Sequence, residues 1–330
     1  MAFLRPLLGD PADRLMASEA ASPALRSERK FRAWFDRKAW RDAAIAIPYL
    51  WLLLFFLLPF FIVLAISLAT SIIAIPPFEF ASDWPYATFK NFARLFTVNT
   101  YWRGYLNSVY FALIATGFCL LIGYPMALAI ARTEGAWKNV LLLLVIMPFW
   151  TSFLLRVYAW IGLLSNNSWF NRGLTGIVNA LFPFWGRLDF IPIMNTNYAV
   201  ILGLTYSYLP FMVLPLYANL ERLDFTLDEA AMDLGSRPWQ VFRDVTLPLS
   251  VPGIIAGALL VFIPCTGELV IPSIMGRADS PMIGRVIGDE YALNRDWPMA
   301  SAVAIALLVL LVVPIMIYNH LQSREGEATP

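Results

Sequence analysis

The sequence predicts an all-α integral membrane protein with six transmembrane helices. The first observation is composition: of 330 residues, 59% are hydrophobic and 14% are charged, and the mean hydropathy is +0.64. Soluble domains are less apolar and more charged. The second is that the apolar residues form six runs, each long enough to cross a hydrocarbon core of ~30 Å as a helix. The third is that several prolines and most of the tryptophans lie between the runs, where helices end near the membrane–water boundary.

The six runs define a transmembrane domain over residues 43–320, followed by a short tail at 321–330. The first run is too long and starts too far from the N-terminus for a signal peptide, so it is expected to be retained. The predicted spans are 43–75, 104–131, 140–164, 198–220, 251–275 and 298–320.

The polar segment 1–42 carries nine Lys or Arg and six Asp or Glu. Within it, Phe31, Trp34 and Phe35 share one side of a helix, which predicts an amphipathic helix at a membrane surface. A solvated helix that leads into the first span is the alternative. No motif in this segment identifies its role.

The distribution of positive charge predicts that both termini are cytoplasmic. With the N-terminus inside, the inner segments hold fifteen Lys or Arg and the outer loops hold eight. Positive residues are enriched on the cytoplasmic side of membrane proteins. The inner segments are then 1–42, 132–139, 221–250 and 321–330.

Composition also argues against an enzyme. The single histidine is His320, and the two cysteines, Cys119 and Cys265, lie in apolar runs. A Cys/His metal site or a nucleophilic catalytic set therefore has almost no candidates. None of the four lysines follows a glycine, which excludes a P-loop. We expect no catalytic residue, no metal and no bound cofactor, and the net charge of +1 gives no indication of nucleic-acid binding.

The inner segment 221–250 is the most informative. Thr226 with Glu229 predicts a capping box that starts a helix at Leu227, and Gly235 suits the residue that ends it. Ser236 is expected to cap a second helix with Pro238 in its first turn, and Leu247-Pro248 to stop that helix at the membrane. A DNA-binding helix-turn-helix has this outline, but tethering at both ends disfavours it. A purely structural loop remains an alternative.

The spacing of this loop resembles the EAA loop of binding-protein-dependent ABC importer permeases, whose signature is E-A-A-x3-G-x9-I-x-L-P. The matching residues are Glu229, Ala230, Ala231, Gly235, Val245 in place of isoleucine, Leu247 and Pro248. In that family the loop docks its first helix on a cytoplasmic ATPase. Small Ala230 and Ala231 would permit a close approach, and an apolar face of Leu227, Ala231 and Leu234 would require a partner.

Other stretches agree with this family over about residues 105–320. Asn107-Ser108 and 123–132 are similar to the start of the permease core, and several stretches resemble the spermidine/putrescine permeases of the PotB/PotH type. The latter are 148–160, 267–272, 283–285 and 294–303.

The resemblance implies a type I importer permease in the bacterial inner membrane, with 221–250 as its cytoplasmic coupling loop. It implies four partners besides membrane lipid: two copies of an ABC ATPase, which bind ATP and magnesium, a second related permease and a periplasmic polyamine-binding protein. Whether the second permease is identical or different is left open.

Two charged residues, Glu268 and Arg156, lie inside predicted spans, where such groups usually face a bundle interior or a water-filled path. Gly267, with Pro264 and Pro272 nearby, predicts an irregular helix at Glu268. One hypothesis is that Glu268 attracts the ammonium groups of a polyamine. The other is a buried Glu268–Arg156 ion pair that fixes helix packing.

Three acids near the outer mouth, Asp289, Glu290 and Asp296, are further candidates for guiding a cation; a solvated loop is the alternative. Tyr291 and Trp297 are candidates for cation–π contacts or for interface anchors.

The prediction is therefore a permease subunit that imports putrescine or spermidine using ATP hydrolysed on another subunit. The alternatives are import of another small organic cation or an amino-acid-like solute, and transport driven by an ion gradient. Secondary transporters usually show inverted repeats, which this sequence lacks. A membrane-embedded enzyme would need clustered His, Cys or acidic residues.

Overall fold

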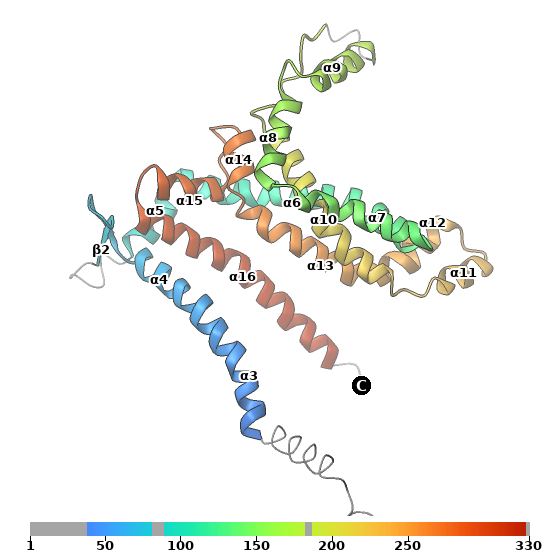
Figure 1. The fold of residues 1–330 in the computed structure, drawn as a ribbon, viewed down its shortest axis with the longest axis horizontal. Coiled ribbons are helices and arrows are strands. Elements are labelled where there is room, and N and C mark those ends of the chain that lie inside the picture. Colours follow the sequence, from blue (N-terminus) through green and yellow to red (C-terminus); the bar gives the residue numbers. More distant parts are fainter. Residues whose placement is uncertain (1–37, 81–88, 182–186, 328–330) are drawn as a thin grey trace, which may run out of the picture. The chain divides into compact units, whose positions relative to one another are not determined.

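The computed structural model describes residues 38–80, 89–181 and 187–327. Most of the polar segment 1–42, with its predicted amphipathic helix, lies outside these residues. The chain forms two compact units, residues 1–63 and 64–330, and each is described by itself. Figure 1 shows the helices and the short hairpin along the chain.

The first unit contains the start of the first span. It comprises α3 (Lys38–Leu52), a π-helical turn (Leu53–Leu57) and the beginning of α4 (Leu58–Ser67). Together they give an apolar helix over Asp42–Ser67. The π turn comes directly before Leu58-Pro59. A proline ring clashes with the carbonyl four residues earlier, here that of Phe55, so the wider turn accommodates Pro59 without ending the helix.

The first span ends at Ser67, eight residues before the predicted end, so that boundary was wrong. The next residues form a two-stranded antiparallel ribbon of Thr70–Ser71 (β1) and Phe78–Glu79 (β2). Asn91 holds the end of the span, because its Nδ2 donates to the carbonyls of Ser67 (3.0 Å) and Ala69 (2.8 Å). A polar side chain from another helix thus satisfies carbonyls that the helix end leaves free.

The second unit is helical apart from the ribbon. After the end of α4 its helices are α5 (Lys90–Thr97), α6 (Asn99–Ala131), α7 (Ala136–Ile146), α8 (Phe153–Leu164), α9 (Trp169–Leu181), α10 (Asn197–Leu220), α11 (Thr226–Asp233), α12 (Pro238–Val241), α13 (Leu247–Thr266), α14 (Val270–Met275), α15 (Ile283–Ala292) and α16 (Trp297–Glu327).

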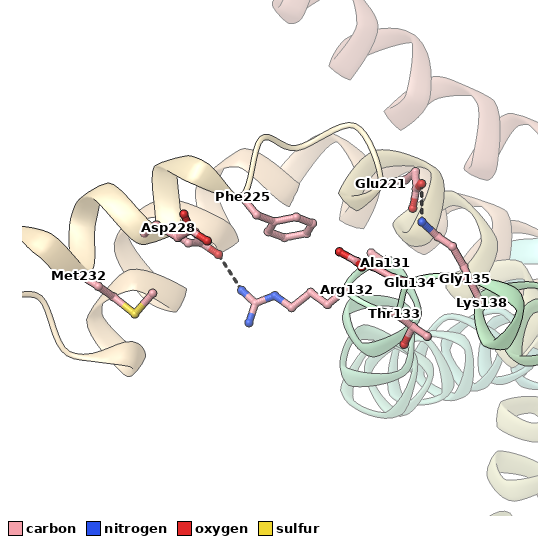
Figure 2. Close-up of a pocket in the computed structure, with 11 residues that line it drawn as sticks. Ala131, Arg132, Thr133, Glu134, Gly135, Lys138, Glu221, Phe225, Asp228 and Met232 are labelled. Atoms are coloured by element: carbon pink, nitrogen blue, oxygen red, sulfur yellow. Dashed lines mark hydrogen bonds and ion pairs between the residues drawn. The ribbon is translucent and has the colours of Figure 1, made fainter.

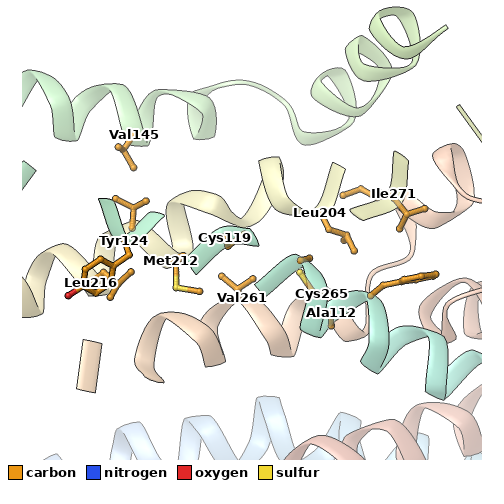
Figure 3. Close-up of a cluster of buried hydrophobic side chains, with 14 of the residues drawn as sticks. Ala112, Cys119, Tyr124, Val145, Leu204, Met212, Leu216, Val261, Cys265 and Ile271 are labelled. Atoms are coloured by element: carbon orange, nitrogen blue, oxygen red, sulfur yellow. The ribbon is translucent and has the colours of Figure 1, made fainter. Parts of the chain in front are cut away.

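Helices α6, α10 and α13 pack against one another and form the centre of this unit. Figure 3 shows their buried side chains, among them Cys119, Met212 and Val261. Glycines permit the close approach: a Cβ on Gly257 would lie 2.8 Å from Met212 Sδ. Small residues serve this purpose in membrane helices, where packing supplies much of the association energy.

The third predicted span, 140–164, is broken. A 3-10 turn (Met147–Trp150) ends α7, and α8 starts at Phe153 after a bend of 91°. Thr151 and Ser152 occupy the break. Pro148, whose missing N–H cannot continue an α-helical ladder, lies in the turn, which explains why the apolar run is not one helix.

Within the part of the chain that the structure describes, four helices are long and apolar enough to cross a membrane, and the bent pair would make a fifth. They are Asp42–Ser67, Asn99–Ala131, Asn197–Leu220 and Pro238–Thr266. The predicted sixth span coincides with α16, whose apolar part is Trp297–Val312, and α16 continues to Glu327 through most of the predicted tail. The helical fold class is confirmed, while the six-span count and the orientation stay predictions.

Candidate functional site

The predicted coupling loop contains α11, but its helix starts differently from the prediction. The helix begins at Thr226, one residue earlier, and Asp224 Oδ1 accepts a hydrogen bond from the Thr226 N–H at 3.0 Å. This bond holds the pKa of the Asp224 carboxyl below its usual range. No Thr226–Glu229 capping box forms. A carboxylate near the positive end of a helix dipole is a stronger acceptor than a hydroxyl, which explains why Asp224 takes this place.

Gly235 ends α11 as predicted. Its φ is +89°, a conformation that residues with a Cβ rarely adopt. The N–H groups of Gly235 and Ser236 donate to the carbonyls of Met232 (2.8 Å) and Ala231 (3.1 Å). These two bonds form a Schellman motif, which satisfies carbonyls at the helix end.

The second helix of the loop starts at Pro238, and Ser236 does not cap it. Arg237 precedes the helix, and its N–H donates to Gln240 Oε1 at 2.8 Å. Leu247-Pro248 does not stop the helix either: a π turn (Phe242–Thr246) connects α12 to α13, giving one helix over Pro238–Thr266. As at Pro59, the π turn contains the carbonyl with which the proline ring would clash.

Most of α11 is exposed on this chain. Glu229 and Ala230 are exposed, and Ala231 is half-buried. Leu227 is 48% and Leu234 89% exposed. The apolar side chains predicted to need a partner therefore lie uncovered on the described part of the chain.

Asp228 is the one buried residue of α11, at 7% exposure, and the sequence analysis missed it. Figure 2 shows it pointing toward Arg132. Arg132 Nη2 donates to Asp228 Oδ2 at 2.6 Å, and Thr246 Oγ1 donates to Oδ1 at 3.1 Å. The only sequence signal was its position three residues after Phe225, which places both on one helix face.

An open cleft of about 620 Å³ lies beside Asp228, between the α6–α7 turn and α11. A second ion pair lines it, because Lys138 Nζ donates to Glu221 Oε1 at 2.5 Å. The two pairs connect the C-terminal end of α6 and the first turn of α7 to residues at both ends of the 221–228 segment. The cleft is lined by Ala131, Arg132, Thr133, Glu134, Gly135, Lys138, Glu221, Phe225, Asp228, Glu229 and Met232.

Glu268 lies in a helix break, which confirms the predicted irregularity. Helix α13 ends at Thr266 and α14 starts at Val270. The Glu268 side chain is buried, with 9% of the residue exposed. Tyr208 of α10 donates its hydroxyl proton to Oε2 at 2.5 Å, and the Val270 N–H donates to Oε1 at 3.0 Å.

Arg156 does not pair with Glu268, so the hypothesis of a buried ion pair was wrong for this structure. Its Nε and Nη1 are buried without a hydrogen-bond partner among the described residues. The guanidinium carbon lies 5.9 Å and 5.8 Å from the ring centroids of Phe149 and Phe153. The carboxylate has neutral donors instead, so no described cation balances its charge.

The three acidic residues that were candidates for guiding a cation take part in helix contacts. Glu290 accepts hydrogen bonds from Tyr101 (2.7 Å) and Asn294 (2.9 Å). Asp296 pairs with Arg94 at 3.2 Å and accepts from the Met299 N–H at 3.1 Å, so it caps α16. Asp289 lies 3.7 Å from Arg285. The positions of these three side chains are therefore explained by contacts within the protein, and no ligand is needed to explain them.

Tyr291 and Trp297 lie together: their rings stack with centroids 5.2 Å apart. The stack joins the end of α15 to the start of α16. Neither ring has a cation over it among the described contacts. Within residues 38–80, 89–181 and 187–327, no group of three or more His, Cys, Asp or Glu could hold a metal ion.

Gly284 is a further residue of the Glu268 break that the sequence analysis did not assign to it. A Cβ at this position would lie 2.5 Å from the Glu268 carbonyl oxygen and closer still to that of Gly267. Helix α15 therefore packs its backbone directly on the break. Asn107 and Ser108 of α6 hold the start of α15, through Pro281 O (3.2 Å) and Ile283 N (2.8 Å).

Comparison with known proteins places this arrangement among transporters. Residues 119–326 match the family described as binding-protein-dependent transport system inner membrane component. The chain is 40% identical over 291 residues to the spermidine/putrescine transport system permease protein PotB of Haemophilus influenzae, covering 86% of this chain and 95% of that protein. PotB of Escherichia coli K12 is 41% identical over 233 residues, covering 70% and 81%.

A solved structure has the same fold. It is a bacterial ABC transporter involved in the import of the acidic polysaccharide alginate, and it matches with a TM-score of 0.60 and 22% identity. The match covers 91% of this chain and 100% of that chain.

Proposed function

The chain belongs to the family of binding-protein-dependent transport system inner membrane components, and from this premise we propose that it is the permease subunit of an ABC importer for putrescine or spermidine. The observation that carries the proposal is the 40% identity to a spermidine/putrescine permease over 86% of the chain. The protein is placed in the inner membrane, as the family description and the apolar helices support.

Energy is supplied by a separate ABC ATPase dimer, which binds ATP and magnesium. The exposed α11 supports this part of the proposal, because Leu227 and Leu234 need a protein partner at the inner face. Glu229, Ala230, Ala231 and Gly235 form and shape that contact, and Leu247-Pro248 joins the loop to the fifth span. A second homologous permease and a periplasmic polyamine-binding protein complete the complex within the lipid bilayer.

Glu268 is the proposed contact for the ammonium groups of the substrate. Its buried carboxylate has two neutral donors and no described cation. A buried charge without a counter-charge is costly, and a cationic substrate would supply the missing charge. Arg156, Asp289, Glu290, Tyr291, Asp296 and Trp297 remain candidates for the path. Of these, Arg156 has the wrong charge to attract a polyamine.

The test of the function is uptake by the reconstituted complex. The permease, its partner permease and the ATPase are placed in liposomes, the binding protein is added outside, and uptake of labelled putrescine and spermidine is measured. We expect ATP-dependent uptake that survives a protonophore. Uptake that collapses with the proton gradient and survives ATP depletion would indicate a secondary transporter. If unlabelled amino acids or other organic cations inhibit uptake and unlabelled polyamines do not, the substrate is not a polyamine.

Glu268→Gln tests the substrate contact. The amide keeps the shape and can accept one of the two hydrogen bonds, but it removes the charge, so uptake should fall at least tenfold while the complex assembles. Glu79→Gln, an exposed acid of β2, is the matched control and should transport normally. Unchanged uptake in Glu268→Gln would remove the carboxylate from the proposed path and leave the family assignment intact.

A further inference from the structure

Asp228 points inward from a helix whose other residues are mostly exposed. It is the only buried residue of α11, whereas its neighbours Leu227 and Glu229 are exposed. A carboxylate is almost never buried without a partner that stabilises its charge. The direction of this side chain therefore requires an explanation other than contact with an external protein.

The partners of Asp228 come from two different membrane helices. Arg132, the residue that follows α6, donates to one carboxylate oxygen at 2.6 Å. Thr246, which is 1% exposed and directly precedes α13, donates to the other at 3.1 Å. One side chain of α11 is thus bonded to the inner ends of the second and fifth predicted spans.

Helix electrostatics favour the same arrangement. Arg132 lies at the C-terminal end of α6, where the helix dipole attracts a cation, and Asp228 lies in the first turn of α11, where the dipole attracts an anion. The Arg132 guanidinium carbon also lies 5.2 Å from the ring centroid of Phe225, the residue before α11. The ion pair, the ring contact and the two dipoles all hold α11 against α6.

We propose that Asp228 is a positioning residue that ties the coupling helix to α6 and α13, so that movement of α11 by the ATPase is passed to both spans. This inference rests on the proposed function. The segments on either side of α11 are short turns, and one contains Gly235 at positive φ. Without the bonds of Asp228, those turns would absorb a displacement of α11. With them, the displacement reaches two of the three helices at the centre of the unit.

The experiment measures how many ATP molecules are hydrolysed per polyamine imported by the reconstituted complex. Asp228→Asn keeps the shape and an acceptor for Thr246 but removes the charge that binds Arg132. We expect at least a threefold rise in ATP consumed per substrate, with normal association of the ATPase. Asp189→Asn, the same change at an exposed position outside α11, should leave the ratio unchanged.

Arg132 variants separate coupling from stability. Arg132→Gln should raise the number of ATP molecules hydrolysed per polyamine as Asp228→Asn does. In the double variant this number should be no higher than in either single variant, because both changes remove the same ion pair. Arg132→Lys keeps a charge and should retain most of the coupling. Thermal stability and yield of the assembled complex are measured for every variant.

Two results would overturn the inference. One is a wild-type ratio in both Asp228→Asn and Arg132→Gln; the other is a loss of uptake that only matches the loss of assembled complex. Failure of the proposed function looks different, because the wild-type protein itself would then not import polyamines.

Discussion

Replacing Gly284 by alanine should disturb the Glu268 break more than any other addition of one methyl group on α15. The added Cβ would lie 2.5 Å from the Glu268 carbonyl oxygen, and the nearby Gly267 carbonyl also obstructs it. Real Cβ contacts essentially never fall below 3.0 Å, so α15 and the break must separate by at least about 0.5 Å. Overpacking of this kind costs typically about 1–3 kcal/mol, since the obstructing atoms belong to the backbone and cannot rotate away.

The assay combines thermal unfolding of the detergent-solubilised complex with polyamine uptake. Gly284→Ala should lower the melting temperature by several degrees and reduce uptake several-fold, because the carboxylate moves with its backbone. Gly288→Ala is the matched control, one turn later on α15: its Cβ would meet the tip of the Leu269 side chain at 2.7 Å, which can change rotamer. Equal stability and uptake in the two variants would refute the reasoning.

Two further predictions concern helix ends. Gly235→Val should leave membrane insertion intact but reduce substrate-stimulated ATP hydrolysis, because a β-branched residue is poorly accommodated at a φ of +89°. Gly235→Asn should retain most of this ATP hydrolysis. Equal ATP hydrolysis in both variants would contradict the requirement for positive φ. Asp296→Ala should destabilise the protein by about 0.5–2 kcal/mol through loss of the α16 cap, while Asp289→Ala, which breaks an exposed pair, should cost no more than about 0.5 kcal/mol. Thermal unfolding compares the two, and a loss of uptake without loss of stability in Asp296→Ala would instead indicate a role in the substrate path.

Local backbone conformation was predictable from the sequence wherever a single residue type determines it. Gly235 and Pro238 each fix a conformation by their own chemistry, and the structure places both as expected. The prolines of the fifth span likewise predicted an irregular helix at Glu268. The effect of Leu247-Pro248 was not predictable in this way, because a π turn of one extra residue relieves the clash that would otherwise stop the helix.

The partners of buried charges were not predictable, because they depend on packing. Opposite charge made Arg156 one of the two partners considered for Glu268, the other being a cationic substrate. The structure instead gives Glu268 the hydroxyl of Tyr208, 60 residues away, and gives Asp228 the guanidinium of Arg132, 96 residues away. A carboxylate accepts hydrogen bonds from both neutral and charged donors, so charge alone could not identify either partner.

Helix α13 joins the two sites, and the difference between its ends indicates what each carboxylate does. Its 20 residues extend about 30 Å at ~1.5 Å per residue, from Thr246 beside Asp228 to the break at Glu268. Asp228 is paired with Arg132, which agrees with its proposed role in holding the helices together. Glu268 has only neutral donors among the described residues, which agrees with its proposed role as a contact for a cationic substrate. A carboxylate already neutralised by an arginine would attract a polyamine only weakly, so the absence of Arg156 from its described contacts favours a substrate role over a packing role.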